Sequence, residues 1–227
     1  MSSADGFDSR LMLNESLWDE LVERLPPDRT IHRANLLHGD SIEQIALNIA
    51  ASAPARFVLI GFSLGGYVAR SLAEQFPGRV AALVLIATLL RPDTASQREL
   101  KAAAVRASAQ GQFRGLSARS IAQSLHPQRA TDKALISRIQ AMGVRMGHKA
   151  FARQSTLARA DIASSTVHCP TLIISGAQDA LRPPEEAQEL CDQIPGACLQ
   201  VVENTGHMIP LEQPGRLAEI IAKNLVS

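Results

Sequence analysis

The segment Gly61-Phe62-Ser63-Leu64-Gly65 has the residue types and the spacing that most directly suggest catalysis in this sequence. It matches the pattern G-x-S-x-G, follows the apolar run 56–61 and opens a helical pattern over 64–76. A sharp turn from a buried strand into a helix lifts a serine Oγ above the end of a sheet. A side chain at position 61 or 65 would collide with neighbouring main chain there. The segment therefore predicts Ser63 as a nucleophile, and the alternative is a glycine-rich turn with an incidental serine.

Two further residues could activate this serine, because a hydroxyl is a poor nucleophile without a base and an acid that orients the base. Asp179 lies just past the apolar run 170–176, and His207 lies just past the run 198–202. The carboxyl ends of parallel strands share one edge of a sheet, so both side chains are expected to meet Ser63. The order Ser, Asp, His along the chain is also the order that G-x-S-x-G predicts.

These assignments have alternatives. Asp93, shortly after the apolar run 82–87, is a second candidate for the acid, although its position suits the N-cap of a following helix better. Asp179 could instead cap a helix or lie in a loop, and His207 could be a solvated loop histidine.

The elements that would position these residues alternate along the chain. Continuous apolar runs predict strands buried on both faces at 56–61, 82–87 and 170–176, with weaker candidates at 30–36 and 198–202. Helical patterns lie at 18–25, 41–51, 64–76, 185–194 and 214–225. This alternation predicts an α/β fold with a mostly parallel sheet flanked by helices.

The stretch 91–165 breaks the alternation. Ser96-Gln97-Arg98-Glu99 has the pattern of a capping box, Gly111 that of a helix stop, and further helical pieces follow at about 116–125, 131–147 and 149–160. Residues 91–160 hold thirteen Lys and Arg against three acidic residues. We therefore expect a basic helical insertion at 91–165 between two parts of one core, 1–90 and 166–227.

The sequence resembles the α/β-hydrolase superfamily in three places. The matching pieces are Gly61-Phe62-Ser63-Leu64-Gly65-Gly66, Ser175-Gly176-Ala177-Gln178-Asp179 and Gly206-His207-Met208-Ile209-Pro210-Leu211-Glu212-Gln213-Pro214. The resemblance implies an α/β-hydrolase fold in which 91–165 is the helical cap. The polar stretch 1–10 is a poor match to a buried strand, so we expect the sheet to be shortened at its N-terminal side.

The resemblance also implies the roles of the site residues. Ser63 would be the nucleophile, His207 the general base and then acid, and Asp179 the acid that orients the imidazole. The oxyanion hole would take one backbone N–H from Leu64 and a second from Leu11, with Met12 the next candidate. The His-Gly or Pro-Gly pair that usually precedes the second donor in relatives is absent here.

These observations predict a serine hydrolase that cleaves a carboxylic ester, thioester or lactone of a small substrate through an acyl-enzyme, without a cofactor. The alternative is a small-molecule-binding member of the same fold that is weakly catalytic or not catalytic. An anionic substrate is favoured if arginines of the insertion face the pocket mouth; otherwise they form a solvated helical face. The candidates are Arg106, Arg114, Arg119, Arg138, Arg145 and Arg153.

Composition excludes several other classes. The chain has 227 residues, a formal net charge of +1 and 4% aromatic residues, and it has no clustered basic run, so we expect no nucleic-acid partner. The longest apolar run, 80–90, is too short to cross a membrane. Cys169, Cys191 and Cys198 lack metal-like spacing, so we expect no metal and reduced, mostly buried thiols. The N-terminus lacks a signal-peptide pattern, and we expect a cytoplasmic monomer or homodimer.

Overall fold

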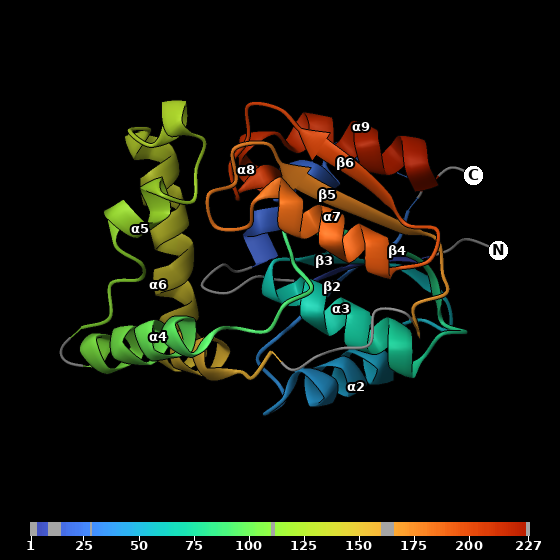
Figure 1. The fold of residues 1–227 in the computed structure, drawn as a ribbon, viewed down its shortest axis with the longest axis horizontal. Helices are drawn as coiled ribbons and strands as arrows, with labels where there is room; N and C mark the ends of the chain where they lie inside the picture. The colour runs from blue at the N-terminus through green and yellow to red at the C-terminus, as the bar shows by residue number, and fades with distance from the viewer. Residues whose placement is uncertain (1–3, 9–14, 28, 110–111, 160–165, 226–227) are drawn as a thin grey trace.

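A parallel sheet between helical layers forms the body of the protein in a computed structural model that describes residues 4–8, 15–27, 29–109, 112–159 and 166–225 (Figure 1). Among these residues the sheet has six strands in the order β2-β1-β3-β4-β5-β6, and every strand pair is parallel. The strands are β1 (Ala4–Asp8), β2 (Ile31–Ala34), β3 (Phe57–Phe62), β4 (Val80–Ile86), β5 (Thr171–Gly176) and β6 (Cys198–Val202). The prediction of a mostly parallel sheet flanked by helices is confirmed.

Helices cover both faces of the sheet, which is why the central strands are continuously apolar. One apolar core lies between the sheet and α2 (Ile42–Ser52), α3 (Leu64–Gln75) and α7 (Pro184–Gln193). The other lies under η1 (Glu15–Trp18), α1 (Asp19–Val22), α8 (Ile209–Glu212) and α9 (Pro214–Leu225). No helix in the described part of the chain is long and apolar enough to span a bilayer.

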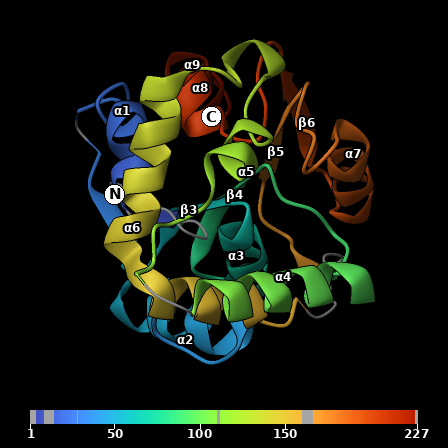
Figure 2. The ribbon, with the colours of Figure 1, turned by 90° about the vertical axis from the view of Figure 1, so that its left-hand side faces the viewer.

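The helices between β4 and β5 form a separate layer beside the sheet. They are α4 (Ala95–Ser108), α5 (Ala118–Ala122), η2 (Pro127–Arg129) and α6 (Lys133–Thr156). Figure 2 shows α4, α5 and α6 in front of the edge where β3, β4 and β5 end. The long α6 is broken at Gly147, which has φ 80°, close to the break expected between 131–147 and 149–160.

Two expectations about local structure are wrong. Residues 4–8 form β1, which pairs with β2 on one side and β3 on the other, so the polar stretch 1–10 does contribute an inner strand. The first helix of the insertion begins at Ala95, and its capping box joins Thr94 and Gln97 rather than residues 96 and 99. Asp93 therefore precedes the N-cap, and Gly111 lies outside the described residues.

Candidate active site

The turn between β3 and α3 holds Ser63 in a strained conformation. Ser63 has φ 52° and ψ −111°, a backbone conformation that residues with a Cβ rarely adopt. Its backbone N–H donates to Ile86 O at 2.9 Å, and its carbonyl accepts from Gly66 N at 3.0 Å. These bonds fix the turn, so the position of the hydroxyl is set by the main chain on both sides.

Gly61 permits this turn because the chain passes very close to itself. A Cβ on Gly61 would lie 2.5 Å from the carbonyl oxygen of Gly65, a distance that real Cβ atoms do not reach. The predicted collision is therefore confirmed for position 61, and it explains why the pattern requires glycine two residues before the serine.

The imidazole of His207 lies between the hydroxyl and a carboxylate. His207 Nε2 is 3.1 Å from Ser63 Oγ, and His207 Nδ1 is 2.6 Å from Asp179 Oδ2. His207 is buried, and the ring of Phe62 lies against it with the centroids 5.4 Å apart. The structure thus brings Ser63, His207 and Asp179 into one hydrogen-bonded chain, as their places after β3, β6 and β5 predicted.

The carboxylate of Asp179 is oriented by the backbone that follows it. Asp179 Oδ1 accepts from Leu181 N at 2.9 Å and from Arg182 N at 2.8 Å, which leaves Oδ2 for the imidazole. The alternative acid, Asp93, forms its ion pairs with Lys101 and Arg159. Of the two candidates, Asp179 is the one that contacts the histidine.

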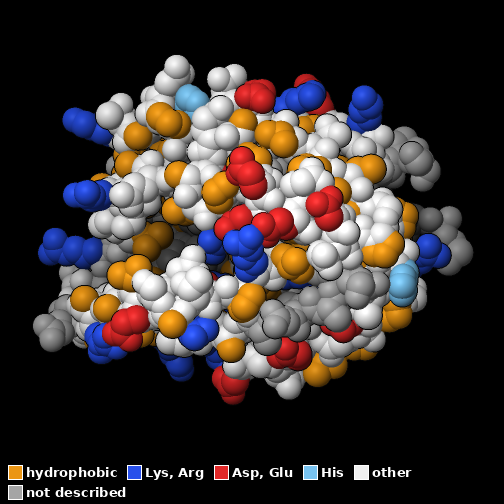
Figure 3. All heavy atoms as spheres, in the orientation of Figure 1, with side chains coloured by type: hydrophobic (Ala, Val, Ile, Leu, Met, Phe, Trp, Pro, Cys, Tyr) orange, Lys and Arg blue, Asp and Glu red, His pale blue; other side chains and the backbone are white. Residues whose placement is uncertain are grey.

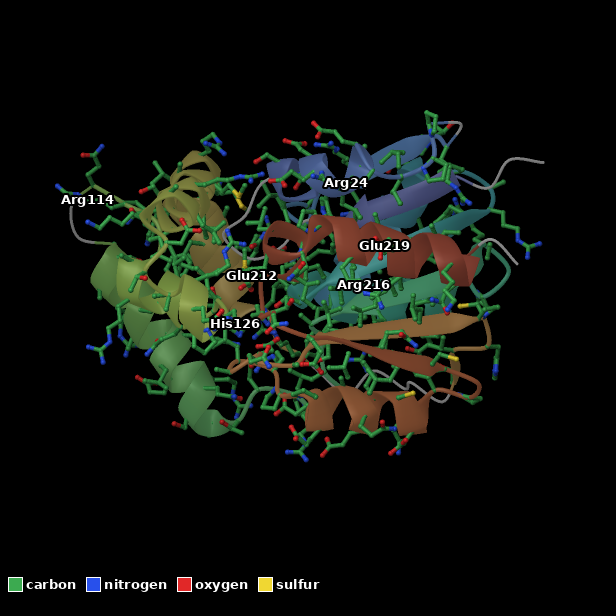
Figure 4. All side chains as sticks on the ribbon, turned by 90° about the horizontal axis from the view of Figure 1, so that it is seen from above. Arg24, Arg114, His126, Glu212, Arg216 and Glu219 are labelled. Atoms are coloured by element: carbon green, nitrogen blue, oxygen red, sulfur yellow. The ribbon has the colours of Figure 1, made fainter. Side chains whose placement is uncertain are left out.

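Glu212 holds the backbone on both sides of His207, a role that the sequence did not reveal. Its carboxylate, 8% exposed, accepts from Gly206 N at 3.0 Å, Met208 N at 3.2 Å and His126 N at 2.7 Å. Burial raises the pKa of Glu212, although these three hydrogen bonds oppose the shift. Figure 4 shows Glu212 beside His126, whereas Arg216 and Glu219 lie on α9.

Gly206 allows the histidine loop to touch the segment that follows α5. A Cβ on Gly206 would lie 2.5 Å from Leu125 C and 2.6 Å from His126 N. The backbone N–H of His207 donates to Ser124 O at 2.9 Å in the same contact. The loop that carries the imidazole is therefore fastened to residues 124–126 by main-chain contacts and by Glu212.

One of the two expected oxyanion donors is placed by the structure. Leu64 is the first residue of α3, so its N–H has no acceptor within the helix. The positive end of the helix dipole lies at the same point, next to Ser63. Leu11, the second expected donor, and Met12 lie outside the described residues.

A cavity of about 440 Å³ opens over Ser63 and His207. Its basic lining residues are Lys101, Arg159 and Arg182. Figure 3 shows the surface hollowed between the α4–α6 layer and the sheet layer. Further Lys and Arg side chains lie along the outer side of the α4–α6 layer in this view. None of the six insertion arginines that were considered for the pocket mouth lines the cavity, and three of them pair elsewhere: Arg106 with Glu99, Arg138 with Glu20 and Arg153 with Asp40.

The described residues offer no group of three or more His, Cys, Asp or Glu arranged to hold a metal ion. The three cysteines are free thiols, but the expectation that they are mostly buried is wrong. Cys169 and Cys191 are half-buried, and Cys198 is exposed because it begins the edge strand β6.

The parallel sheet flanked by helices is the fold of an α/β hydrolase. Residues 26–214 match the family described as alpha/beta hydrolase fold, and the chain belongs to this family. The resemblance that the sequence motifs indicated is therefore confirmed.

The named relatives agree with the prediction of a hydrolase that acts on ester bonds, and a solved structure agrees with the fold. Pimeloyl-[acyl-carrier protein] methyl ester esterase of Neisseria meningitidis serogroup C is 31% identical over 211 residues, covering 86% of this chain and 82% of that protein. The protein of that name from Aromatoleum aromaticum is 29% identical over 233 residues, covering 92% of each chain. A thermophilic esterase from Thermogutta terrifontis superposes with a TM-score of 0.84 at 23% identity, covering 99% of this chain and 90% of that one. The last comparison supports the fold alone.

Proposed function

We propose that this ester-acting hydrolase cleaves a carboxylic ester of a small substrate through Ser63, His207 and Asp179 and an acyl-enzyme intermediate. The observation that carries the proposal is the hydrogen-bonded chain from Ser63 Oγ to His207 Nε2 at 3.1 Å and from His207 Nδ1 to Asp179 Oδ2 at 2.6 Å. This is the geometry that a nucleophile, its general base and an orienting acid require.

In the first half-reaction, Ser63 Oγ attacks the carbonyl carbon while His207 Nε2 takes the hydroxyl proton. The carbonyl oxygen becomes an oxyanion, which the N–H of Leu64 and the end of the α3 dipole stabilise. Asp179 keeps the Nδ1 proton on the imidazole and stabilises the imidazolium that forms. The imidazolium then protonates the leaving alcohol, and the acyl group stays on Ser63.

In the second half-reaction, a water takes the place of the alcohol. His207 Nε2 removes a proton from this water as its oxygen attacks the acyl carbon, and the imidazolium returns the proton to Ser63 Oγ when the acid leaves. The same imidazole therefore serves as base and then acid in both steps. One ester and one water are converted into one carboxylic acid and one alcohol, and Ser63 and His207 return to their starting protonation states.

The helices α4, α5 and α6 belong to this proposal as a cap. Residues 91–165 form it, and 1–90 with 166–227 form the hydrolase core. Lys101 of α4 and Arg159, which follows α6, line the cavity with Ser63, so the cap contributes directly to the space where a substrate would lie. The side chains of the cap that line the cavity would then set substrate preference, while the core supplies the chemistry.

The name that these relatives share suggests a first substrate to test. Those proteins are named for the methyl ester of a pimeloyl group on a carrier protein. We propose methyl esters of medium-length acyl chains as the substrate class for this chain. Thioesters and lactones remain chemically accessible to the same three residues, because each presents an acyl carbon to the same nucleophile.

Labelling with a fluorophosphonate probe, followed by methanol release from methyl esters, tests the proposal. We expect the wild-type protein to be labelled on Ser63 and to release methanol, and Ser63→Ala and His207→Gln to lose both activities while keeping the wild-type circular dichroism spectrum. A folded wild-type protein that is not labelled and hydrolyses no ester would overturn the proposal in favour of a binding protein with the same fold.

A further inference from the structure

The catalytic cavity has more positive than negative side chains in its wall. Lys101, Arg159 and Arg182 line it, and Asp93 is the one carboxylate among the described lining residues. Glu186 lies close enough to Arg182 for their charges to interact. These residues come from four segments: Asp93 follows β4, Lys101 is on α4, Arg159 follows α6 and Arg182 follows β5. Segments from both the α4–α6 layer and the core therefore bring cations to the same space beside Ser63.

Asp93 compensates only part of this charge. It is 7% exposed, and its Oδ2 accepts from Lys101 Nζ at 2.5 Å and also from Arg159 Nη1. One carboxylate thus serves two cations. The side-chain hydrogen bond found for Arg182 goes to the carbonyl oxygen of Leu181 at 2.8 Å, and no described carboxylate forms an ion pair with it.

The same cations affect the pKa of Lys101. Burial of Lys101 and the positive charge of Arg159 lower the pKa of Lys101 to about 8, although Asp93 opposes the shift, and Arg182 adds to the lowering. For Asp93, burial raises the pKa, but the hydrogen bond from Lys101 and the charge of Arg159 outweigh it, so the pKa lies below its usual range. An anion bound beside Lys101 would stabilise the charged ammonium group and so raise the pKa of Lys101.

The same cavity offers apolar surface beside its cations. Leu100 is 68% exposed and Leu181 is 40% exposed, although both are large hydrophobic residues, and both line the cavity. A ligand with a methylene chain would cover this surface and be stabilised by the removal of apolar area from water. The lining therefore suits a molecule that is apolar in its middle and anionic at its end.

We propose that Lys101, Arg159 and Arg182 form an anion subsite in the cavity that also contains Ser63. This subsite binds the free carboxylate at the end of the acyl chain that is far from the reacting ester. The substrate class is then the monoester of a dicarboxylic acid, with the ester carbonyl at Ser63 and the free carboxylate at the anion subsite. Asp93 holds two of the three cations in place. This inference rests on the proposed function, since Ser63 defines which end of the substrate reacts.

Matched pairs of methyl esters test the anion subsite. The monomethyl and dimethyl esters of one dicarboxylic acid share the chain and the scissile bond and differ in one negative charge. Across the series from succinate to pimelate, we expect kcat/KM to favour the monomethyl ester by about 10-fold at one chain length, mainly through KM. The preference falls with added salt, because ions screen the attraction.

Arg182→Gln removes one cation of the subsite and is expected to reduce the preference for the monomethyl ester about 10-fold. The matched control is Arg114→Gln, because Arg114 is exposed and lies at the far side of the α4–α6 layer (Figure 4). It removes the same charge from the protein and should leave the preference and both rates unchanged. The wild-type preference should also weaken above about pH 8, where Lys101 loses its proton.

The outcomes separate this inference from the proposed function. Hydrolysis of the dimethyl ester that depends on Ser63, with no preference for the monomethyl ester at any length, overturns the anion subsite and leaves the function standing. A preference that Arg182→Gln does not reduce also overturns it. If no ester is hydrolysed, calorimetry can measure binding of the monomethyl esters to Ser63→Ala and to the double variant Ser63→Ala, Arg182→Gln. The anion subsite requires that the esters bind to Ser63→Ala and that binding weakens when Arg182 is replaced.

Discussion

Replacing Glu212 by Gln should weaken both the fold and catalysis, because one buried carboxylate accepts three backbone N–H bonds around His207. The amide retains one acceptor oxygen. If that oxygen stays with Gly206 and Met208, the amide NH₂ group faces the N–H of His126, so the His126 N–H loses its acceptor and the new NH₂ group has none. Leaving a buried donor unpaired costs about 1–3 kcal/mol. With two such groups, we take about 2 kcal/mol as the minimum cost of Glu212→Gln.

Thermal unfolding and steady-state kinetics measure the two consequences. For a domain of this size, about 2 kcal/mol lowers Tm by about 4–8 °C. The histidine loop would also be held less accurately, and a displacement of about 1 Å in a reacting group can cost about 100-fold in rate. We therefore expect kcat of Glu212→Gln to fall by about 10- to 100-fold with little change in KM. Glu212→Ala is less useful, because it leaves three donors unpaired and risks unfolding the protein.

Glu219→Gln is the control, since it makes the same chemical change at an exposed position of α9. Glu219 pairs with Arg216 at 3.0 Å, and the two side chains are 68% and 57% exposed. Exposed ion pairs contribute little, so the free energy of unfolding should change by less than about 0.5 kcal/mol. Wild-type Tm and wild-type kcat in Glu212→Gln would refute the idea that this carboxylate holds the loop.

Three further predictions concern the same site. Ser63→Gly and Ser63→Ala both remove the nucleophile, but φ 52° suits glycine, so denaturant unfolding should show Ser63→Gly to be more stable by about 1 kcal/mol; equal midpoints would argue against strain. Asp179→Asn should lower kcat by about 10⁴-fold with KM nearly unchanged, because it favours the wrong imidazole tautomer; a loss below about 10-fold would mean that Asp179 does not orient His207. Gly206→Ala should cost about 1–3 kcal/mol, measured by urea denaturation, because its Cβ would lie 2.5 Å from Leu125 C; unchanged stability would show that the loop moves aside freely.

The residues of the hydrogen-bonded chain could be found from the sequence because a topological rule places them. Ser63 and Asp179 each follow a continuous apolar run, and His207 follows the weaker strand candidate 198–202. Parallel strands end at one edge of the sheet, so these positions meet there. The runs themselves are easy to recognise, since strands covered on both faces are apolar at every position. The order of strands along the chain is sufficient for this prediction, and the directions of individual side chains are not required.

The inner strand β1 escaped sequence analysis because its residues do not form an apolar run. Ala4–Asp8 has the sequence ADGFD, and two aspartates in five residues argue against a buried strand. The strand is instead defined by its neighbours, which pair with it over Asp5 to Asp8 on one side and Ala4 to Phe7 on the other. Tertiary pairing overrides local preference here.

The side chains that complete the site are set by packing, which single-sequence patterns do not contain. The excess of basic residues in the insertion was visible, but the six arginines named from it do not line the cavity, whereas Lys101 and Arg159 do. Glu212 stands within the motif that carries His207, yet its bond to His126 joins residues 86 positions apart. Neither spacing nor periodicity predicts such a contact.

The long span of these contacts has a consequence for how activity is acquired during folding. His207 and Ser63 are 144 residues apart in the sequence, and the bond from Glu212 to His126 closes a loop of 86 residues. Closing long loops is entropically costly and slow, whereas helices such as α2 and α9 form from local contacts. The polypeptide would regain its helical content well before the imidazole reaches the hydroxyl. Hydrolytic competence would then be among the last properties to return when the denatured chain is allowed to refold.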